Sequence, residues 1–260
     1  MRIFILVIYI VSSLTGLAQT LEIWPMANEG VMIKVGEQQV IIDGLFKSTY
    51  PQFASTPASI YEKLQNSIAP FNMVELILAS HKHSDHFTVP EIARVLKGAD
   101  QTQLYVNEEM AEEMRSSPMW TMISKRVTEF PYAEETVYVR GDIKVRTFPI
   151  LHARKKPSEM KNTAHVITID GFNIMHVGDA THGQQDLVDL NVSELDLDVL
   201  ILPFWFVRDQ FGQSFVEKNL PARKYFINHI PPAQLKNVID LLGDQPDMIV
   251  MGKEVFRFEK

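Results

Sequence analysis

The chain has 260 residues, of which 46% are hydrophobic and 22% charged, as in an ordinary globular protein with one large domain or two small ones. Its net charge of -7 offers no basic footprint of the kind that nucleic-acid enzymes use to bind phosphates. The absence of cysteine excludes disulfide bonds, a thiolate nucleophile and cysteine-ligated zinc.

Residues 1–18 have the features of a signal peptide. Arg2 precedes an apolar run over residues 3–11, and Gly16 and Ala18 are small residues at the spacing that signal peptidase recognises. We therefore predict cleavage before Gln19 and export of residues 19–260, to the periplasm or out of the cell. The apolar run is short for a membrane span, which needs roughly 20 residues, so we expect no stable membrane insertion after cleavage; an uncleaved anchor is the alternative.

The elements that follow begin with short strands. Residues 21–24, 31–35 and 40–44 alternate and are separated by turn residues, which predicts a β-meander. Residues 57–68 carry Ile60, Leu64 and Ile68 at helical spacing, which predicts an amphipathic helix.

The segment after the next expected strand, 74–80, is the most informative in the chain. His81-Lys82-His83-Ser84-Asp85-His86 holds four potential metal ligands in six residues, although the whole chain has only 8 histidines. Imidazoles at positions 81 and 83 can converge on one cation, and Asp85 and His86 can reach a neighbouring one. A polar turn with chance histidines is the alternative interpretation.

Beyond this motif, strands and helices are interleaved. Thr88 and Glu91 suggest a capping box for a helix that ends near Gly98, and Asn107 is expected to cap another helix. Hairpins are predicted over 136–150 and, with a turn at Asp170-Gly171, over 164–177. A strand is predicted at 104–106, and the last third predicts helices near 184–190 and 232–242 and strands at 198–202, 224–228 and 248–251. This order indicates a layered α/β or α+β domain.

Three further donors each follow an apolar strand. His152 follows the run 145–150, Asp179 the run 173–177 and His229 the run 225–227. Side chains just past a strand can converge on a cleft at the edge of a sheet, and a catalytic zinc usually needs three protein ligands.

The ordered series of these residues resembles the five motifs of the metallo-β-lactamase superfamily over nearly the whole mature chain. The series is Asp43, His81-x-His83-x-Asp85-His86, His152, Gly178-Asp179 and His229. The resemblance implies an α+β fold, the four-layer αββα sandwich, with a site for two divalent metal ions at one edge. These ions are usually Zn²⁺, and Mn²⁺ or Fe also suit such donors.

Carried over residue by residue, the resemblance also implies roles for these side chains. His81, His83 and His152 would hold the first metal, and Asp85, His86 and His229 the second. Asp179 would bridge the two ions, and Asp43 would support the site from behind its ligands. His182 is a rival to His229 as a ligand and otherwise a candidate, with His176, for protonating the leaving group.

The subfamily is narrowed by the Gly178-Asp179 pair. The β-lactamases proper lack a bridging Asp there, so the chain is more similar to glyoxalase II, RNase Z, acyl-homoserine-lactone lactonases and the ascorbate-phosphate lactonase-like group. The expected export signal and the net negative charge of the chain disfavour RNase Z.

Other residues have two interpretations each. His165 would be a packed or an exposed strand histidine. Arg154-Lys155-Lys156 would draw an anionic substrate or be a solvated turn, and the aromatics of 204–206 would wall a pocket or pack in the core.

The function predicted from all this is an exported hydrolase of a small molecule. Two metal ions would activate a water molecule that attacks an ester, lactone, amide or phosphodiester bond, and Asp85 would also carry a proton. The alternatives are a noncatalytic metal- or ligand-binding protein of the same fold and, with less support, a nuclease. No nucleic-acid partner is expected.

Overall fold

The computed structural model describes residues 19–153 and 159–260. The expected leader and the basic segment Arg154-Lys155-Lys156 lie outside these ranges. No helix within the described ranges combines the length and apolarity needed to cross a bilayer.

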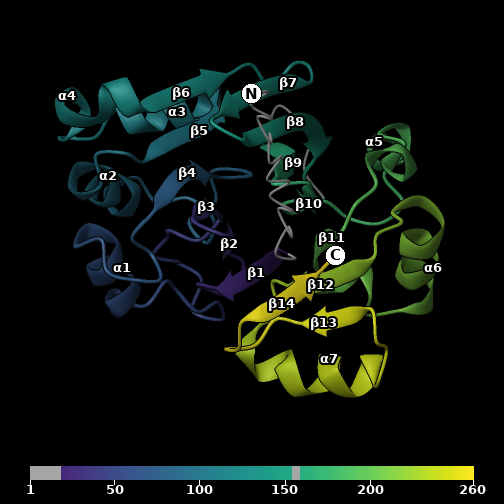
Figure 1. Cartoon of the computed structure of the whole chain (residues 1–260). Helices are drawn as coiled ribbons and strands as arrows, with labels where there is room; N and C mark the ends of the chain where they lie inside the picture. The colour runs from purple at the N-terminus through teal and green to yellow at the C-terminus, as the bar shows by residue number, and fades with distance from the viewer. Residues whose placement is uncertain (1–18, 154–158) are drawn as a thin grey trace, which may run out of the picture.

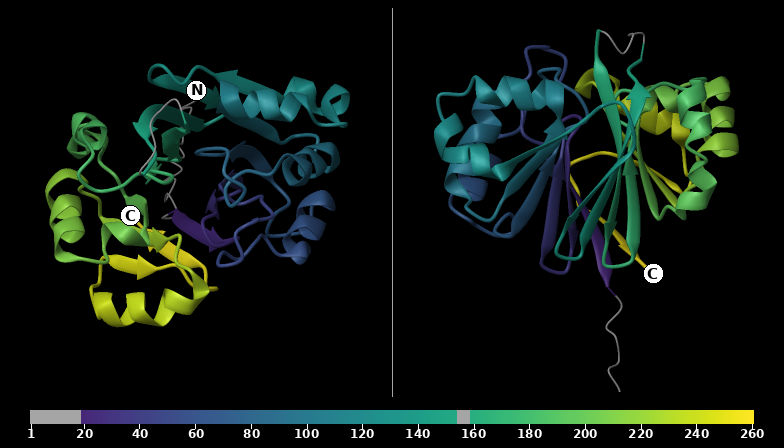
Figure 2. Two further views of the ribbon diagram at one scale, coloured as in Figure 1. Left: turned by 180° about the vertical axis from the view of Figure 1, so that it is seen from behind. Right: turned by 90° about the horizontal axis from the view of Figure 1, so that it is seen from above.

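Two seven-stranded mixed sheets pack face to face, and helices cover the outer face of each sheet (Figure 1; Figure 2, right). The first sheet has the order β14-β1-β2-β3-β4-β5-β6 and the second β13-β12-β11-β10-β9-β8-β7. The strands of the first sheet are β1 (Thr20–Pro25), β2 (Val31–Val35), β3 (Gln38–Ile42), β4 (Val74–Leu78), β5 (Gln103–Asn107), β6 (Val127–Phe130) and β14 (Phe256–Glu259). Those of the second are β7 (Thr136–Arg140), β8 (Ile143–Leu151), β9 (Lys161–Ile169), β10 (Phe172–His176), β11 (Val199–Pro203), β12 (Lys224–Asn228) and β13 (Met248–Val250).

The helices divide between the two outer faces. Those over the first sheet are α1 (Ala58–Gln65), α2 (Val89–Gly98), α3 (Glu108–Arg115) and α4 (Trp120–Ile123), and those over the second are α5 (Gln185–Asp189), α6 (Gln210–Asn219) and α7 (Leu235–Leu242). Short 3-10 helices lie at Ser124–Arg126, Val192–Leu195, Phe204–Phe206 and Pro232–Gln234. The expected four-layer αββα sandwich is confirmed.

Strand β3 shows why the sheets are sandwiched. Val40 and Ile42 belong to the core between the two sheets, whereas Ile41 belongs to the core beneath the helices of the first sheet. Successive side chains of a strand point to opposite faces, so a continuous apolar run requires cover on both sides. The layered architecture follows from such runs.

Both sheets change from antiparallel to parallel pairing partway across. β3 to β6 pair in parallel, as do β10 to β13, and the remaining neighbours are antiparallel. The loops that leave the carboxyl ends of β4, β10 and β12 therefore gather at one edge of the sandwich, where crevices form in mixed α/β sheets.

Two local expectations were wrong. Thr88 precedes α2, but its side chain makes no cap bond to the helix; its hydroxyl donates to Ser84 O and accepts from Lys47 N. The first helix ends at Gln65, and Ile68 beyond it is 47% exposed rather than part of an apolar face. The expected Asn107 cap is confirmed, because Met110 N donates to Asn107 Oδ1 over 3.1 Å.

Candidate metal centre

Donor residues from four loops meet at one edge of the sandwich. The hexapeptide 81–86 follows β4, His152 follows β8, Asp179 comes shortly after β10, and His229 directly follows β12. Six of the seven donors are buried, and His83 is half-buried. Stretches up to 148 residues apart in the chain, from 81 to 229, are thus brought together by the pairing of strands in two sheets.

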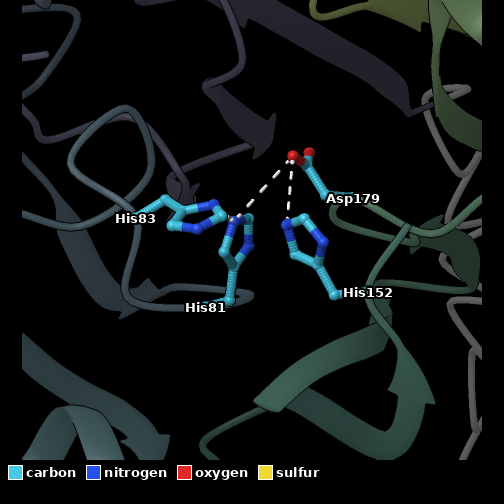
Figure 3. Close-up of side chains that lie close together, drawn as sticks. All are labelled: His81, His83, His152 and Asp179. Atoms are coloured by element: carbon cyan, nitrogen blue, oxygen red, sulfur yellow. Dashed lines mark hydrogen bonds and ion pairs between the residues drawn. The ribbon is translucent and has the colours of Figure 1, made fainter. Parts of the chain in front are cut away.

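The first group consists of His81, His83, His152 and Asp179, which offer donor atoms that all lie within 4.8 Å of one another (Figure 3). Asp179 Oδ2 lies 3.9 Å from His81 Nε2 and 3.5 Å from His152 Nε2. His81 Nε2 lies 2.9 Å from His83 Nδ1. This is a compact nitrogen-rich set of the kind that holds a catalytic zinc ion.

The second group consists of Asp85, His86 and His229, again with donor atoms within 4.8 Å of one another. The other carboxylate oxygen of Asp179, Oδ1, lies 3.3 Å from both His86 Nε2 and His229 Nε2. The two oxygens of one carboxylate therefore face different groups, which is the arrangement needed to bridge two cations.

The unpaired atoms at this edge fit metal ions. Five buried donor atoms have no hydrogen-bond partner among the described residues: Asp85 Oδ1, His86 Nε2, His152 Nε2, Asp179 Oδ1 and His229 Nε2. Each unpaired buried polar atom costs about 1–3 kcal/mol, so a cluster of them is unusual unless it has a ligand. Imidazole and carboxylate donors suit Zn²⁺, Mn²⁺ or Fe.

Protonation of the histidines differs sharply across the site. Burial lowers the pKa of His81 well below its usual range and that of His83 to about 4, which favours neutral, metal-binding imidazoles. Burial alone would lower the pKa of His86 too, but the charges of Asp179 and Asp43 raise it well above its usual range. A cation entering the second group must displace that proton, so binding there weakens as the pH falls.

Asp43 lies behind both groups and orients one histidine in each. Its Oδ2 accepts from Ser80 Oγ over 2.6 Å and from His86 Nδ1 over 2.8 Å. Because the Ser80 hydroxyl donates to Asp43, it accepts from His81 Nδ1, 2.9 Å away. Both Nδ1 atoms are thereby protonated donors, which leaves the Nε2 atoms of His81 and His86 to face the site. The expected support from Asp43 is present in this geometry.

Gly178 allows the Asp179 loop to approach the hexapeptide. Its φ is +53°, and a Cβ at this position would lie 2.3 Å from Asn162 Oδ1 and 2.6 Å from Ser80 Cβ. A residue with a side chain would have to push these groups away and adopt a strained backbone. The Gly-Asp order is thus required by the close approach of the two loops.

Glu29 is a site residue that the sequence analysis missed. It is fully buried, its Oε1 lies 3.5 Å from His229 Nδ1, and burial raises its pKa to about 7. Asn228 Nδ2 donates to Glu29 O, and His229 N donates to Asn28 O. An acid in a short connection between strands is ordinary, so only this packing against the loop after β12 shows its role.

The other histidines lie outside both groups. His182 is half-buried, and its ring contacts Phe206 and Phe211. His176 Nδ1 accepts from Gly178 N over 3.0 Å. His165 was expected to be either packed or exposed, and it is packed. It is fully buried, and its Nε2 donates to Ala79 O over 3.1 Å.

A cavity of about 260 Å³ opens over Asp179, lined by Ala153, Thr181, Trp205 and Arg208 as well. The ring of Trp205 packs against His229, with centroids 4.8 Å apart, whereas Phe206 is fully buried in the core. Within residues 204–206, Trp205 therefore walls the cavity and Phe206 packs in the core, so each of the two interpretations holds for one residue.

Comparison with known proteins agrees with this fold. The family model "Beta-lactamase superfamily domain" matches residues 40–248. No curated protein matches the sequence. Igni18, a metallo hydrolase from Ignicoccus hospitalis, is 15% identical with a TM-score of 0.65, over 93% of this chain and 99% of that chain. The metallo-β-lactamase fold protein YhfI from Bacillus subtilis is 14% identical with a TM-score of 0.60, over 93% and 100%.

A third structure has a similar fold. CmlA from Streptomyces venezuelae, a diiron β-hydroxylase, is 12% identical with a TM-score of 0.54, over 94% of this chain and 54% of that chain. At these identities the three structures establish a shared fold. The family match spans most of the sequence, and the chain belongs to the metallo-β-lactamase superfamily.

Proposed function

We propose that the chain is a hydrolase that holds two divalent metal ions and cleaves a small molecule. The observation that carries the proposal is the placement of Asp179, whose two oxygens face the two donor groups at 3.3–3.9 Å. His81, His83 and His152 would hold one ion, and Asp85, His86 and His229 the other. The unpaired buried atoms of both groups support the same assignment.

When bound, the ions would supply a water molecule of lowered pKa and positive charge to stabilise the transition state. The residues of the chain hold and orient the reactants. Trp205 and Ala153 wall the cavity beside Asp179. Asp85 Oδ1 is buried without a hydrogen-bond partner in the described chain, so it is our candidate to accept a proton.

His182 is our candidate for protonating the leaving group. Its Nδ1 has no hydrogen-bond partner among the described residues, and its neighbour Thr181 lines the cavity. The size of the cavity favours a small substrate, since sites for drug-sized ligands are usually about 300–1,000 Å³. The proposed bond is an ester, lactone, amide or phosphodiester.

The test is metal content and turnover of the purified protein. We expect two equivalents of metal by elemental analysis and chelator-sensitive hydrolysis within a panel of lactones, esters, thioesters and phosphodiesters. His83→Ala should lose activity and tight metal binding and stay folded, whereas Glu159→Gln, a matched change of a polar residue outside both groups, should keep both. Two bound metals without turnover would instead support a noncatalytic binding protein, and full activity of His83→Ala would refute the ligand assignment.

We also propose that the chain is exported, on the basis of residues 1–18. Amino-terminal sequencing of the protein from a bacterial host should find Gln19 as the first residue. An intact leader in the membrane fraction would support the anchor, and an intact leader in the cytosol would refute export.

A further inference from the structure

Among the residues in 19–153 and 159–260 that line the cavity over Asp179, the one cation is Arg208. It lies between the 3-10 helix Phe204–Phe206 and α6, with 49% of its side chain exposed. Its ion pair within the described chain is with Asp209, Nε to Oδ2, at 3.7 Å. The other Asp209 oxygen accepts from Gly212 N as the cap of α6. The guanidinium therefore keeps hydrogen-bonding capacity toward the cavity.

A guanidinium beside this site has an electrostatic cost. Asp85, Asp179 and the buried Asp43 behind them carry three negative charges against the four positive charges of two divalent ions, so the loaded site would be positive before Arg208 is counted. Like charges at short range repel, and the repulsion is relieved when an anion lies between them. A positive cavity in a chain of net charge -7 also attracts and concentrates anions locally.

The cavity also offers an apolar surface. Trp205 Nε1 donates to Ala180 O over 2.8 Å, which holds the indole in place and satisfies its polar atom. The rest of the ring, with the methyl group of Ala153, presents hydrocarbon to the cavity. A ligand that matches both features has a compact carbon skeleton and a charged end.

We infer that the substrate is a small organic anion, with a carboxylate or phosphate that pairs with Arg208 while its scissile bond lies over Asp179. This inference rests on the proposed function. Hydrolysis adds water across the bond: the water oxygen bonds to the acyl carbon, the bond from that carbon to the leaving oxygen breaks, and the leaving oxygen takes a proton. The planar guanidinium can bind either oxyanion with two hydrogen bonds, which a lysine cannot do.

Three esters with the same scissile bond test the inference on the metal-loaded protein. They are 4-nitrophenyl hydrogen glutarate, 4-nitrophenyl 4-phosphonobutanoate and the neutral 4-nitrophenyl methyl glutarate. We expect kcat/KM to be roughly tenfold or more higher for a charged ester, as for a hydrogen bond to a charged group. Arg208→Gln should remove this advantage mainly by raising KM, and should lower kcat/KM for the neutral ester much less than for the charged esters.

Arg94→Gln is the matched control, because Arg94 is similarly exposed, at 47%, and lies on α2. Arg94→Gln should keep the full preference in kcat/KM for the charged esters over the neutral ester. The charged ester that loses most in Arg208→Gln identifies the oxyanion. An unchanged preference in Arg208→Gln, or no preference in the unmodified protein, would overturn the inference.

Binding separates this inference from the proposed function. If no ester is cleaved, monomethyl glutarate and dimethyl glutarate are titrated against tryptophan emission, with Trp205→Phe as the blank. Tighter binding of the anion that disappears in Arg208→Gln would preserve the anion site while the hydrolase proposal fails. Equal binding of both compounds would overturn the anion site itself.

Discussion

The two halves of the site are built in different ways. On the first sheet, four donors come from one hexapeptide after β4, and Asp43 directly behind them orients His81 and His86 through short hydrogen bonds. On the second sheet, His152, Asp179 and His229 follow three separate strands. Their support is looser, as in the 3.5 Å contact of Glu29 with His229.

The difference shows which interactions fix the geometry of each half. The spacing of the hexapeptide is set by local backbone, whereas the second half depends on the register of several strands and on contacts between the sheets. Two hydrogen bonds join the segment before the hexapeptide to the second sheet: His165 Nε2 donates to Ala79 O and Thr163 N donates to Ser80 O. Substitutions of residues that link the two halves should therefore have larger effects than substitutions of residues that support one half from behind.

The largest effect is expected from Asp179→Asn, which removes the carboxylate that faces both donor groups. We expect activity to fall on the order of 1,000-fold, because charge at the centre of the site is lost. Elemental analysis should show less than two equivalents of metal. Asp189→Asn, on the exposed side of α5, is the control and should bind both ions. Two tightly bound metals in Asp179→Asn would mean that each donor group holds its ion without the shared carboxylate.

Gly178→Ala should disrupt the contact between the halves. The new Cβ would overlap Asn162 and Ser80 in a left-handed backbone conformation, at a cost of roughly 3 kcal/mol or more in the free energy of unfolding. Gly171→Ala is the matched control, since its φ is also positive and no atom lies within 4 Å of the added Cβ. The control should cost only about 1–2 kcal/mol in denaturant unfolding. Equal losses in both variants would contradict the close approach.

His165, which joins β9 to the end of β4, should make stability depend on pH. Burial lowers its pKa from 6.5 to about 4, so only the unfolded chain takes up a proton between these values. The contribution of the neutral His165 to the free energy of unfolding is therefore fully present above pH 6.5 and is lost as the pH falls toward 4. Between pH 7.5 and pH 5 the unmodified protein should lose about 2 kcal/mol more than His165→Gln, which keeps a donor.

This comparison is made by denaturant unfolding in chelator, so that metal binding does not contribute. The groups that both proteins share cancel in the difference. Parallel pH profiles for the two proteins would show that His165 is not a buried neutral group.

The smallest effects are expected from the supports behind each half. Ser80→Ala removes the hydroxyl between Asp43 and His81 and should weaken metal binding about 10–100-fold, as is typical for residues that orient ligands. Glu29→Gln should weaken it less, because its contact with His229 is longer. Calorimetric titration of the metal into each variant measures both. A larger loss in Glu29→Gln would reverse the ranking of the two halves.

Much of the fold could be predicted because its signals are local. Apolar runs such as Val40-Ile41-Ile42 predict strands covered on both faces, and Asn107 caps its helix as expected. Strands β6 and β14 and helix α6 were missed. β14 pairs with β1 at the other end of the chain, Thr20 opposite Glu259, and its exposed alternate residues give it little apolar character of its own.

At the site, too, local sequence patterns predicted some features and tertiary contacts decided others. The sequence by itself determined the candidate donor set, because His81, His152, Asp179 and His229 lie just past apolar runs and the remaining donors share one hexapeptide with His81. Only the tertiary structure decided that His229 rather than His182 joins the second group, that Glu29 lies behind it, and that Arg208 and Trp205 face the cavity. The physical reason is range: backbone geometry places residues a few positions apart, whereas loops from different strands meet only after both sheets have paired in register and packed.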